Sequence, residues 1–184
     1  MAFPAFLDTC VLFSPTLTDT LLRIAEEDAF RPHWSVGVLD ELRTVLVREG
    51  LPAEKADKRI AAMESAFQAA SVAGYEPLVD AMACDPKDRH VLAAAVHARC
   101  EVLVTFNLKD FPPSSTESHQ ISVVSPDAFL LDQLDLYPAK VGRALVGQMT
   151  AAQRPQLSMG QLLGRLAKSG VEAFAEEARR HEFA

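Results

Sequence analysis

The sequence predicts an α/β protein built on a parallel sheet that carries helices on both of its faces. Short apolar runs alternate with amphipathic stretches of helix length up to residue 124, which is the pattern of βαβ units. The chain has 184 residues, 49% of them hydrophobic, which is enough for a core of ordinary size. No apolar run approaches the roughly 20 residues of a membrane-spanning helix, so no membrane association is expected.

Each element follows from a local pattern of apolar and polar residues. The expected strands are residues 3–8, 101–106 and 120–124, with a short strand or turn at 71–76 and a polar loop at 112–119. The expected helices are residues 16–29, 36–48, 53–70, 77–83 and 86–99. Ser35 is a good N-cap for the helix that begins at residue 36.

From Ser125 onward the pattern becomes wholly helical. The segment SPDAFLLDQLDL opens with a Ser-Pro-Asp helix start. Further helical stretches follow at 138–151, 158–168 and 170–181, punctuated by Pro138, Pro155 and Gly170. We therefore expect an α/β domain over residues 1–130 and a helical extension over 131–184 that packs on this domain or on a partner.

The charge and the cysteines restrict the class of protein and its compartment. The net charge of -7 argues mildly against a nucleic-acid partner, although a bound cation would offset acids that gather at one site. The 3 cysteines have no CxxC spacing and cannot all pair, which favours free thiols in a reducing cytoplasm. The N-terminus lacks the basic start and apolar stretch of a secretory signal, so a cytoplasmic protein is expected.

Polar residues directly follow two of the expected strands. Asp8 ends the apolar run PAFL, where a carboxylate is costly unless it is paired, caps a turn or takes part in chemistry. Thr105, Asn107 and Asp110 stand at or just beyond the end of EVLVTF, where turn chemistry alone explains the amide and the acid. Because parallel sheets place their sites beyond the carboxyl ends of the strands, we expect both clusters at one edge of the sheet.

Two further acids stand on expected helices. Glu41 lies at the border of the apolar stripe of the helix at 36–48, and a glutamate that reaches from this border into water is explained without function. Asp88 follows Asp85, a natural N-cap, and Pro86, at the first helical position. An acid in the first turn also complements the helix dipole, so local helix chemistry accounts for both aspartates when they are taken alone.

Taken together, the acids indicate a metal site. Close carboxylates repel one another by roughly 1 to 4 kcal/mol per pair, so they gather only where protons or a cation offset the repulsion. Mg²⁺ and Mn²⁺ accept such oxygen ligands, and a metal-activated water suits the hydrolysis of a phosphodiester. The sequence lacks the signatures of other classes, namely GxGxxG, a Walker loop, HExxH and GxSxG.

Four motifs occur in order along the chain, LDTCVLF, WSVGVLDEL, DPKDRHVLAAAV and LVTFNLKDFP. Together they resemble the PIN-domain family, and in particular its VapC-type toxin ribonucleases, over about residues 3–130. The helical tail resembles an extension carried by one branch of the family. The resemblance implies a Rossmann-like three-layer α/β/α sandwich and an endonuclease that hydrolyses RNA with Mg²⁺ or Mn²⁺. It also implies a cognate antitoxin protein as a partner, and self-association as a homodimer.

The resemblance assigns the catalytic acids to Asp8, Glu41 and Asp88. Asp8 and Asp88 are then expected to ligate the metal, and Glu41 to position the metal or the attacking water. The fourth acid of the family falls on Asn107, so Asp110 is the candidate for the missing charge and for a fourth metal ligand. This departure leaves open whether the site holds one metal ion or two.

Supporting roles are expected for the neighbours of these acids. The resemblance gives Thr105 and Asn107 hydrogen bonds to the metal ligands. Lys87, Arg89 and Lys109 flank the acids and are candidates for contacts to phosphate; solvated cations at helix ends and in loops explain them equally well.

Two other classes of function compete with the nuclease. Because Asn107 replaces an acid, a PIN-like binding module with an impaired site remains an alternative to the nuclease. A phosphatase of the haloacid dehalogenase type also begins with a strand and an aspartate, but it needs a second acid two residues later, where this chain has Cys10. The phosphatase is therefore disfavoured.

Overall fold

The computed structural model describes residues 2–151, 157–181 and 183. It divides the chain into two compact units, which are described separately. The first contains Phe3–Phe13 and Arg31–Val124, and the second contains Ser14–Phe30 and Ser125–Ala184. Pro155, expected to separate two helices, lies outside the described residues.

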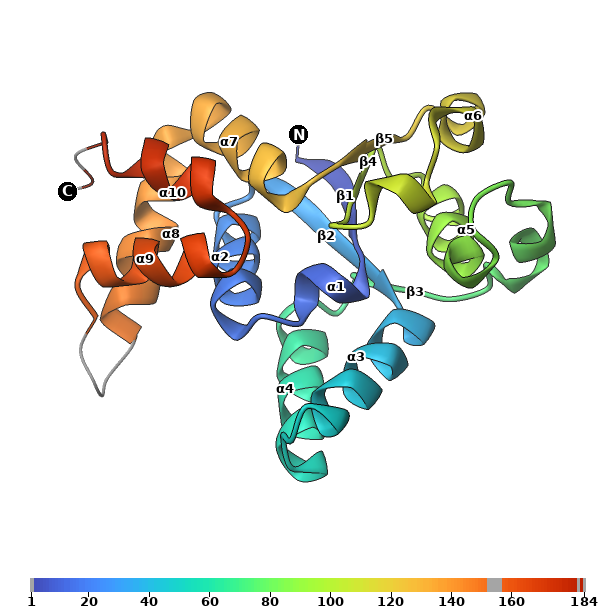
Figure 1. Cartoon of the computed structure of the whole chain (residues 1–184), viewed down its shortest axis with the longest axis horizontal. Coiled ribbons are helices and arrows are strands. Elements are labelled where there is room, and N and C mark those ends of the chain that lie inside the picture. Colours follow the sequence, from blue (N-terminus) through green and yellow to red (C-terminus); the bar gives the residue numbers. More distant parts are fainter. Residues whose placement is uncertain (1, 152–156, 182, 184) are drawn as a thin grey trace. The chain divides into compact units, whose positions relative to one another are not determined.

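A five-stranded parallel sheet organises the first unit (Figure 1). Its strands are β1 (Phe3–Leu7), β2 (Phe30–Ser35), β3 (Ser71–Val72), β4 (Val102–Val104) and β5 (Ser122–Val124), in the order β3-β2-β1-β4-β5. The apolar residues of β1 and β4 are buried apart from the half-buried first residues Phe3 and Val102, as expected for a sheet with helices on both faces. The predicted α/β fold class with a parallel sheet is confirmed.

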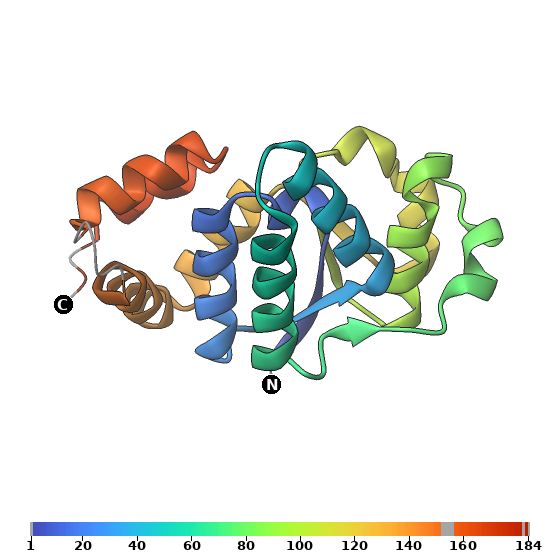
Figure 2. The same ribbon diagram turned by 90° about the horizontal axis from the view of Figure 1, so that it is seen from below.

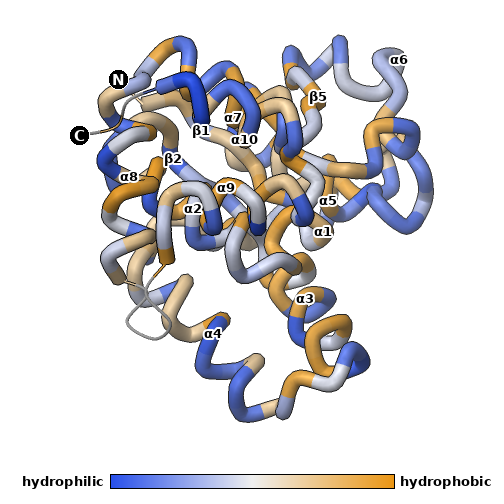
Figure 3. Tube along the Cα trace, turned by 60° about the vertical axis from the view of Figure 1, so that its left-hand side comes forward, coloured by the Kyte–Doolittle hydropathy of each residue, from blue (hydrophilic) through white to orange (hydrophobic). Residues whose placement is uncertain are grey.

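Helices and short 3₁₀ turns connect these strands. The α-helices of the first unit are α1 (Thr9–Leu12), α3 (Val36–Arg48), α4 (Ala53–Ala66), α5 (Arg89–His97) and α6 (Pro113–Thr116). The 3₁₀ turns are η1 (Glu76–Ala81), η2 (Pro86–Asp88), η3 (Leu108–Asp110) and η4 (Glu117–His119). Figures 1 and 2 show α3 and α4 side by side, and α3 also contacts α5. Figure 3 shows that hydrophobic positions recur along α3, whereas much of α4 is hydrophilic.

Several segments differ from the sequence-based expectation. Residues 77–83, expected as a helix, overlap the 3₁₀ turn η1, the helix expected at 86–99 begins with the 3₁₀ turn η2, and α1 was not expected. Residues 30–35 form β2, although Pro32 interrupts the pattern of a strand. The strand tolerates the proline because β3 is so short that its pairing with β2 begins only at Trp34, so the side of β2 facing β3 requires no N–H at residue 32. Residues 113–119, expected as a loop, form α6 and η4, which are too short to show a helical period.

The second unit is helical. It contains α2 (Pro15–Glu26), α7 (Pro126–Leu136), α8 (Pro138–Ala151), α9 (Met159–Lys168) and α10 (Glu172–Ala178). Helix α2 packs on α8 and α9, and the buried Thr20 hydroxyl donates a hydrogen bond of 2.6 Å to Gln148 Oε1. The Asp127 carboxylate accepts hydrogen bonds from the backbone N–H groups of Ala173 and Phe174 and so holds the start of α10. No helix within the described ranges is long and apolar enough to cross a membrane.

Candidate active site

Asp8 lies where β1 passes into α1. Its backbone N–H donates to the Val104 carbonyl at 3.1 Å and so extends the pairing of β1 with β4 by one residue. Its carboxylate is buried, with only 4% of the residue exposed. Oδ1 accepts the N–H of Thr9 at 2.7 Å, and Oδ2 accepts the Thr105 hydroxyl at 2.7 Å. Asp8 therefore caps a helix, and it is also presented at the carboxyl edge of the sheet, as the sequence predicts.

Cys10 takes part in the same network, which sequence reasoning did not foresee. Its thiol lies 3.3 Å from Asp8 Oδ2 and its sulfur accepts the N–H of Phe106 at 3.3 Å. Burial and then the negative charge of Asp8 raise the pKa of Cys10 to about 12, so the side chain stays a neutral thiol that donates to Asp8. The available signal was its position two residues after the acid.

A pocket of about 350 Å³ opens beside this network. Four of its lining residues are sequence-predicted site residues, namely Asp8, Glu41, Asp88 and Asn107. The others are Thr9, Cys10, Phe13 and Val45. The pocket thus brings together three carboxylates from three separate segments of the chain. Thr105 lies behind Asp8 and is fully buried.

Glu41 stands at the rim of this pocket with half of its side chain exposed. The Thr9 hydroxyl donates to Glu41 Oε2 at 2.8 Å. On the other side, His90 Nε2 lies 3.0 Å from Glu41 Oε1, the distance of an ion pair when the imidazole is protonated. Neither Thr9 nor His90 was singled out from the sequence, although each lies within two residues of a candidate acid.

Asp88 is the pocket acid whose ionised form is disfavoured. It lies at the junction of η2 and α5, and burial followed by the nearby charge of Asp8 raises its pKa from 3.8 to about 7. Its Oδ2 is buried and makes no hydrogen bond to any residue that the structure describes. As predicted, Asp85 caps the turn before it, because its carboxylate accepts the N–H of Lys87 at 3.1 Å.

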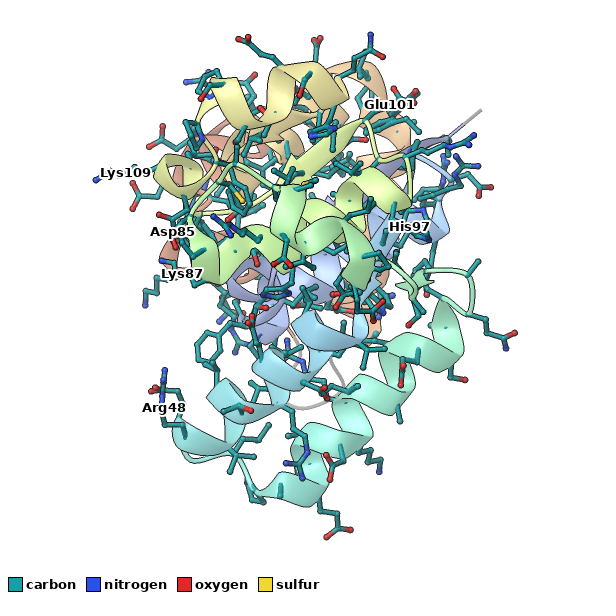
Figure 4. The ribbon with its side chains drawn as sticks, turned by 90° about the vertical axis from the view of Figure 1, so that its right-hand side faces the viewer. Arg48, Asp85, Lys87, His97, Glu101 and Lys109 are labelled. Carbon is teal, nitrogen blue, oxygen red and sulfur yellow. The ribbon has the colours of Figure 1, made fainter. Side chains whose placement is uncertain are left out.

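The remaining candidates lie outside the described lining of the pocket. Lys87 Nζ is 3.1 Å from Asp110 Oδ2 and 3.8 Å from Asp88 Oδ2, so Asp110 is paired with a lysine. Asp110 is not among the described residues that line the pocket, although it is close enough to Asp88 to raise the pKa of that carboxyl. Lys87 and Lys109 are exposed at one edge of the molecule in Figure 4. Arg89 is half-buried, and its Nε is without a hydrogen-bond partner among the described residues.

The donor set fits a hard divalent cation, although it is incomplete. Within the described ranges, no three His, Cys, Asp or Glu side chains lie close enough together to form a metal-binding group. The buried Oδ2 of Asp88 has no hydrogen-bond partner among the described residues and only a 3.8 Å ion pair with Lys87. Together with the raised pKa of this carboxyl, it nevertheless marks a place where a cation would be favourable. Carboxylate and amide oxygens line the pocket, and these are the ligands that Mg²⁺ and Mn²⁺ prefer.

Comparison with known proteins extends these observations. The sequence profile of the PIN domain matches residues 4–109, and that of the VapC50 C-terminal domain matches residues 126–180. Over 107 residues the chain is 47% identical to a protein of Mycobacterium tuberculosis (strain ATCC 25618 / H37Rv) named "Putative ribonuclease VapC50". The match covers 58% of this chain and 63% of that relative. No solved structure matches the chain significantly.

These matches confirm the resemblance that the four sequence motifs carry. The PIN profile covers more than half of the chain, including Asp8, Glu41 and Asp88. The profile of the C-terminal domain covers the helices α7 to α10. The chain belongs to the PIN domain family.

Proposed function

We propose that this chain is a metal-dependent endoribonuclease that hydrolyses RNA phosphodiester bonds, and that it is the toxin of a prokaryotic toxin–antitoxin pair. The observation that carries the proposal is the convergence of Asp8, Glu41 and Asp88 on one pocket at the carboxyl edge of the sheet. Family membership and the name of the Mycobacterium tuberculosis relative support the choice of RNA as substrate and of a toxin role.

The acids of the pocket are proposed as ligands of Mg²⁺ or Mn²⁺. Asp8 and Asp88 hold the ion, Glu41 lies at the rim, and Asn107 offers a carbonyl oxygen. When bound, such an ion supplies a water of lowered pKa and neutralises charge on the scissile phosphate. Asp110 is the weaker candidate, because Lys87 already neutralises it.

The other residues of the network orient the acids. The Thr105 hydroxyl and the Cys10 thiol both donate to Asp8 Oδ2 and so fix the carboxylate toward the pocket. The Asn107 N–H donates to the Thr105 oxygen at 3.0 Å and ties the loop after β4 to the same network. Preorganised hydrogen bonds of this kind hold a ligand in the geometry that the metal requires.

The pocket also offers contacts for the rest of a nucleotide. Phe13 and Val45 form an apolar wall beside the acids, and an unpaired base can stack on an exposed aromatic ring. Lys87 and Lys109, exposed nearby, remain candidates for phosphate contacts along the strand. The acidic pocket itself would repel a phosphate until a cation is bound.

Substitution of Asp8 by asparagine tests the proposal. An amide oxygen can still accept the N–H of Thr9, so α1 keeps its cap, but the charge for a metal is lost. We expect cleavage of a single-stranded RNA in Mn²⁺ to fall by about 100-fold or more, and EDTA to abolish cleavage by the native protein. Cleavage that survives the substitution would refute the role of Asp8.

The second candidate function is a PIN-like binding module with an impaired site. The neutral Asn107 in the pocket favours it, as does the lack of a three-acid metal cluster among the residues described. Native protein that binds RNA or a partner but cleaves no RNA in Mg²⁺ or Mn²⁺ would establish this alternative.

Several consequences of the toxin role are also proposals. They are an antitoxin protein that binds at or beside the acidic pocket, a homodimer, and a cytoplasmic location. The division into a nuclease domain over 1–130 and a helical extension over 131–184 is proposed as well. A small DNA-binding protein encoded beside this chain would support the toxin role.

A further inference from the structure

Glu41 is held more firmly than its exposure suggests. An isolated glutamate with half of its side chain exposed would sample several rotamers. Here Thr9 reaches Oε2 at 2.8 Å from α1, while His90 Nε2 lies 3.0 Å from Oε1 on α5. The two carboxylate oxygens are thus contacted by residues of two different elements, α1 and α5, and we call these two contacts the grip on Glu41.

His90 is directed at Glu41. Only 22% of its side chain is exposed, and its Nε2 is buried. In the described part of the chain this nitrogen has no hydrogen-bond partner, and Glu41 Oε1 lies 3.0 Å from it. His90 also lies on the first turn of α5, two residues after Asp88, so the grip connects Glu41 to the segment that carries another acid of the pocket.

Helix α3 is shaped to receive the imidazole. Gly37 and Glu41 are four residues apart on this helix and therefore share one face. A Cβ at residue 37 would lie 3.3 Å from His90 Nδ1 and 2.9 Å from the Tyr75 hydroxyl. Glycine thus leaves the space into which the ring fits, one helical turn from the carboxylate that the ring contacts.

We propose that His90 is a positioning residue that holds the Glu41 carboxylate at the rim of the acidic pocket, where it acts with Asp8 and Asp88 on a divalent cation. The proposal rests on the proposed metal-dependent function and adds to it a residue beyond the acids themselves. Partners of this kind typically change metal affinity by 10- to 100-fold. Thr9 completes the grip from the segment that carries Asp8.

The test measures Mn²⁺ affinity of the full chain by isothermal titration calorimetry. We expect His90→Ala to weaken binding about tenfold, and His90→Gln, which retains an N–H donor, to restore most of the affinity. His97→Ala is the matched control, because His97 is exposed and lies at the other end of α5 from Asp85 and Lys87 in Figure 4. It should bind Mn²⁺ as the native chain does.

A second variant tests the geometry without removing any side chain of the grip. Gly37→Ala must displace the His90 ring or Tyr75, so we expect a smaller loss of Mn²⁺ affinity. Thermal melts of the metal-free variants separate positioning from folding. Native affinity in His90→Ala, or equal loss in the alanine and glutamine variants with lowered melting temperatures, would overturn the proposal. A native chain that binds no Mn²⁺ would instead refute the metal-dependent function on which the proposal rests.

Discussion

The two ends of the parallel sheet carry pockets of similar size and different chemistry. The pocket at the carboxyl edge holds about 350 Å³ and is lined by three acids, whereas a pocket of about 400 Å³ lies at the amino edge. The amino-edge pocket is lined by Pro4, Arg31, Pro32, His33, Phe67, Ala69, Ala70 and Ala98. Size therefore does not distinguish the two edges of the sheet, whereas the clustering of like charges does.

Each pocket contains a side chain whose charged form is disfavoured, and in the acidic pocket this holds for Asp88 as well as for Cys10. Burial and the charge of Asp8 raise the pKa of Asp88, whereas burial, followed by the charge of Arg31, lowers the pKa of His33 against the opposing effect of the Ala70 carbonyl. Neutral His33 is a common result of burial and needs no ligand. Several acids kept together despite their repulsion indicate a site whose stability is sacrificed for function.

The largest expected effect comes from Asp88→Asn. RNA cleavage should fall by about 100-fold or more because a proposed metal ligand is lost, while the metal-free protein should become more stable at pH 8. In the folded state the pKa of Asp88 is about 7, above the ordinary value of 3.8. Asp88 therefore keeps its proton to a higher pH in the folded chain than in the unfolded chain, and the native stability falls as the pH rises from about 4 to about 7.

The Asp88→Asn variant has no carboxyl to ionise at this position, so it does not lose native stability in this way as the pH rises. We expect a gain on the order of 1 kcal/mol at pH 8, discounted for solvent screening, which corresponds to about 2–4 °C in melting temperature. At pH 3.5 the gain should vanish. Thermal melts in EDTA at both pH values measure the difference, and a variant that is equally destabilised at both would contradict the strained charge of Asp88.

An intermediate effect is expected at the apolar wall of the acidic pocket. Phe13 is 38% exposed, and Arg59 holds it by donating to the Leu12 and Phe13 carbonyls at 2.6 and 3.1 Å. Since stacking on a base contributes about 1–3 kcal/mol, Phe13→Ala should raise the KM for single-stranded RNA about tenfold.

A matched control distinguishes stacking from general hydrophobicity. Phe106 is 39% exposed but is not among the described residues that line the pocket. Phe106→Ala should leave the KM nearly unchanged, and Phe13→Trp should preserve it. Equal effects of the two alanine substitutions would argue against a base at the pocket wall.

The smallest effect is expected at the amino edge. Because the pKa of His33 is lowered from 6.5 in the folded state, the unfolded chain takes up a proton first on acidification. The native stability is therefore complete above about pH 6.5 and declines below it. His33→Gln should reduce this loss of native stability below about pH 6.5 by less than about 1 kcal/mol relative to the native chain, since the imidazole is only half-buried. Urea titrations at pH 5 and 7.5 measure it, with RNA cleavage unchanged as the control.

Local chemistry made much of the fold and the site predictable. Ser35 caps α3 through the N–H of Val38, and the helix has the predicted bounds. Asp8, Thr105 and Asn107 could be placed at one edge because they directly follow buried strands. Asp88 was found by the family resemblance, since its Pro-containing helix start explains the acid without function. The predicted parallel sheet then brings these residues to one edge, since the carboxyl ends of its strands share that edge.

The remainder depends on contacts between distant segments. No local pattern shows that His90 and Thr9 grip Glu41, since these contacts exist only after three helices have assembled. The pairing of Lys87 with Asp110 was hidden for the same reason. Strand β2 was missed because a proline in a strand is tolerated only when the neighbouring strand is short, which the sequence of β2 itself does not reveal.

The position of α2 within the second unit has a consequence for synthesis on the ribosome. Thr20 and its partner Gln148 are 128 residues apart, and ribosomes add roughly 5–20 residues per second. The face of α2 that packs on α8 therefore waits about 6–25 s for its partner to be made. During this interval an amphipathic helix is exposed in the nascent chain, so the second unit can close only after α8 has been synthesised.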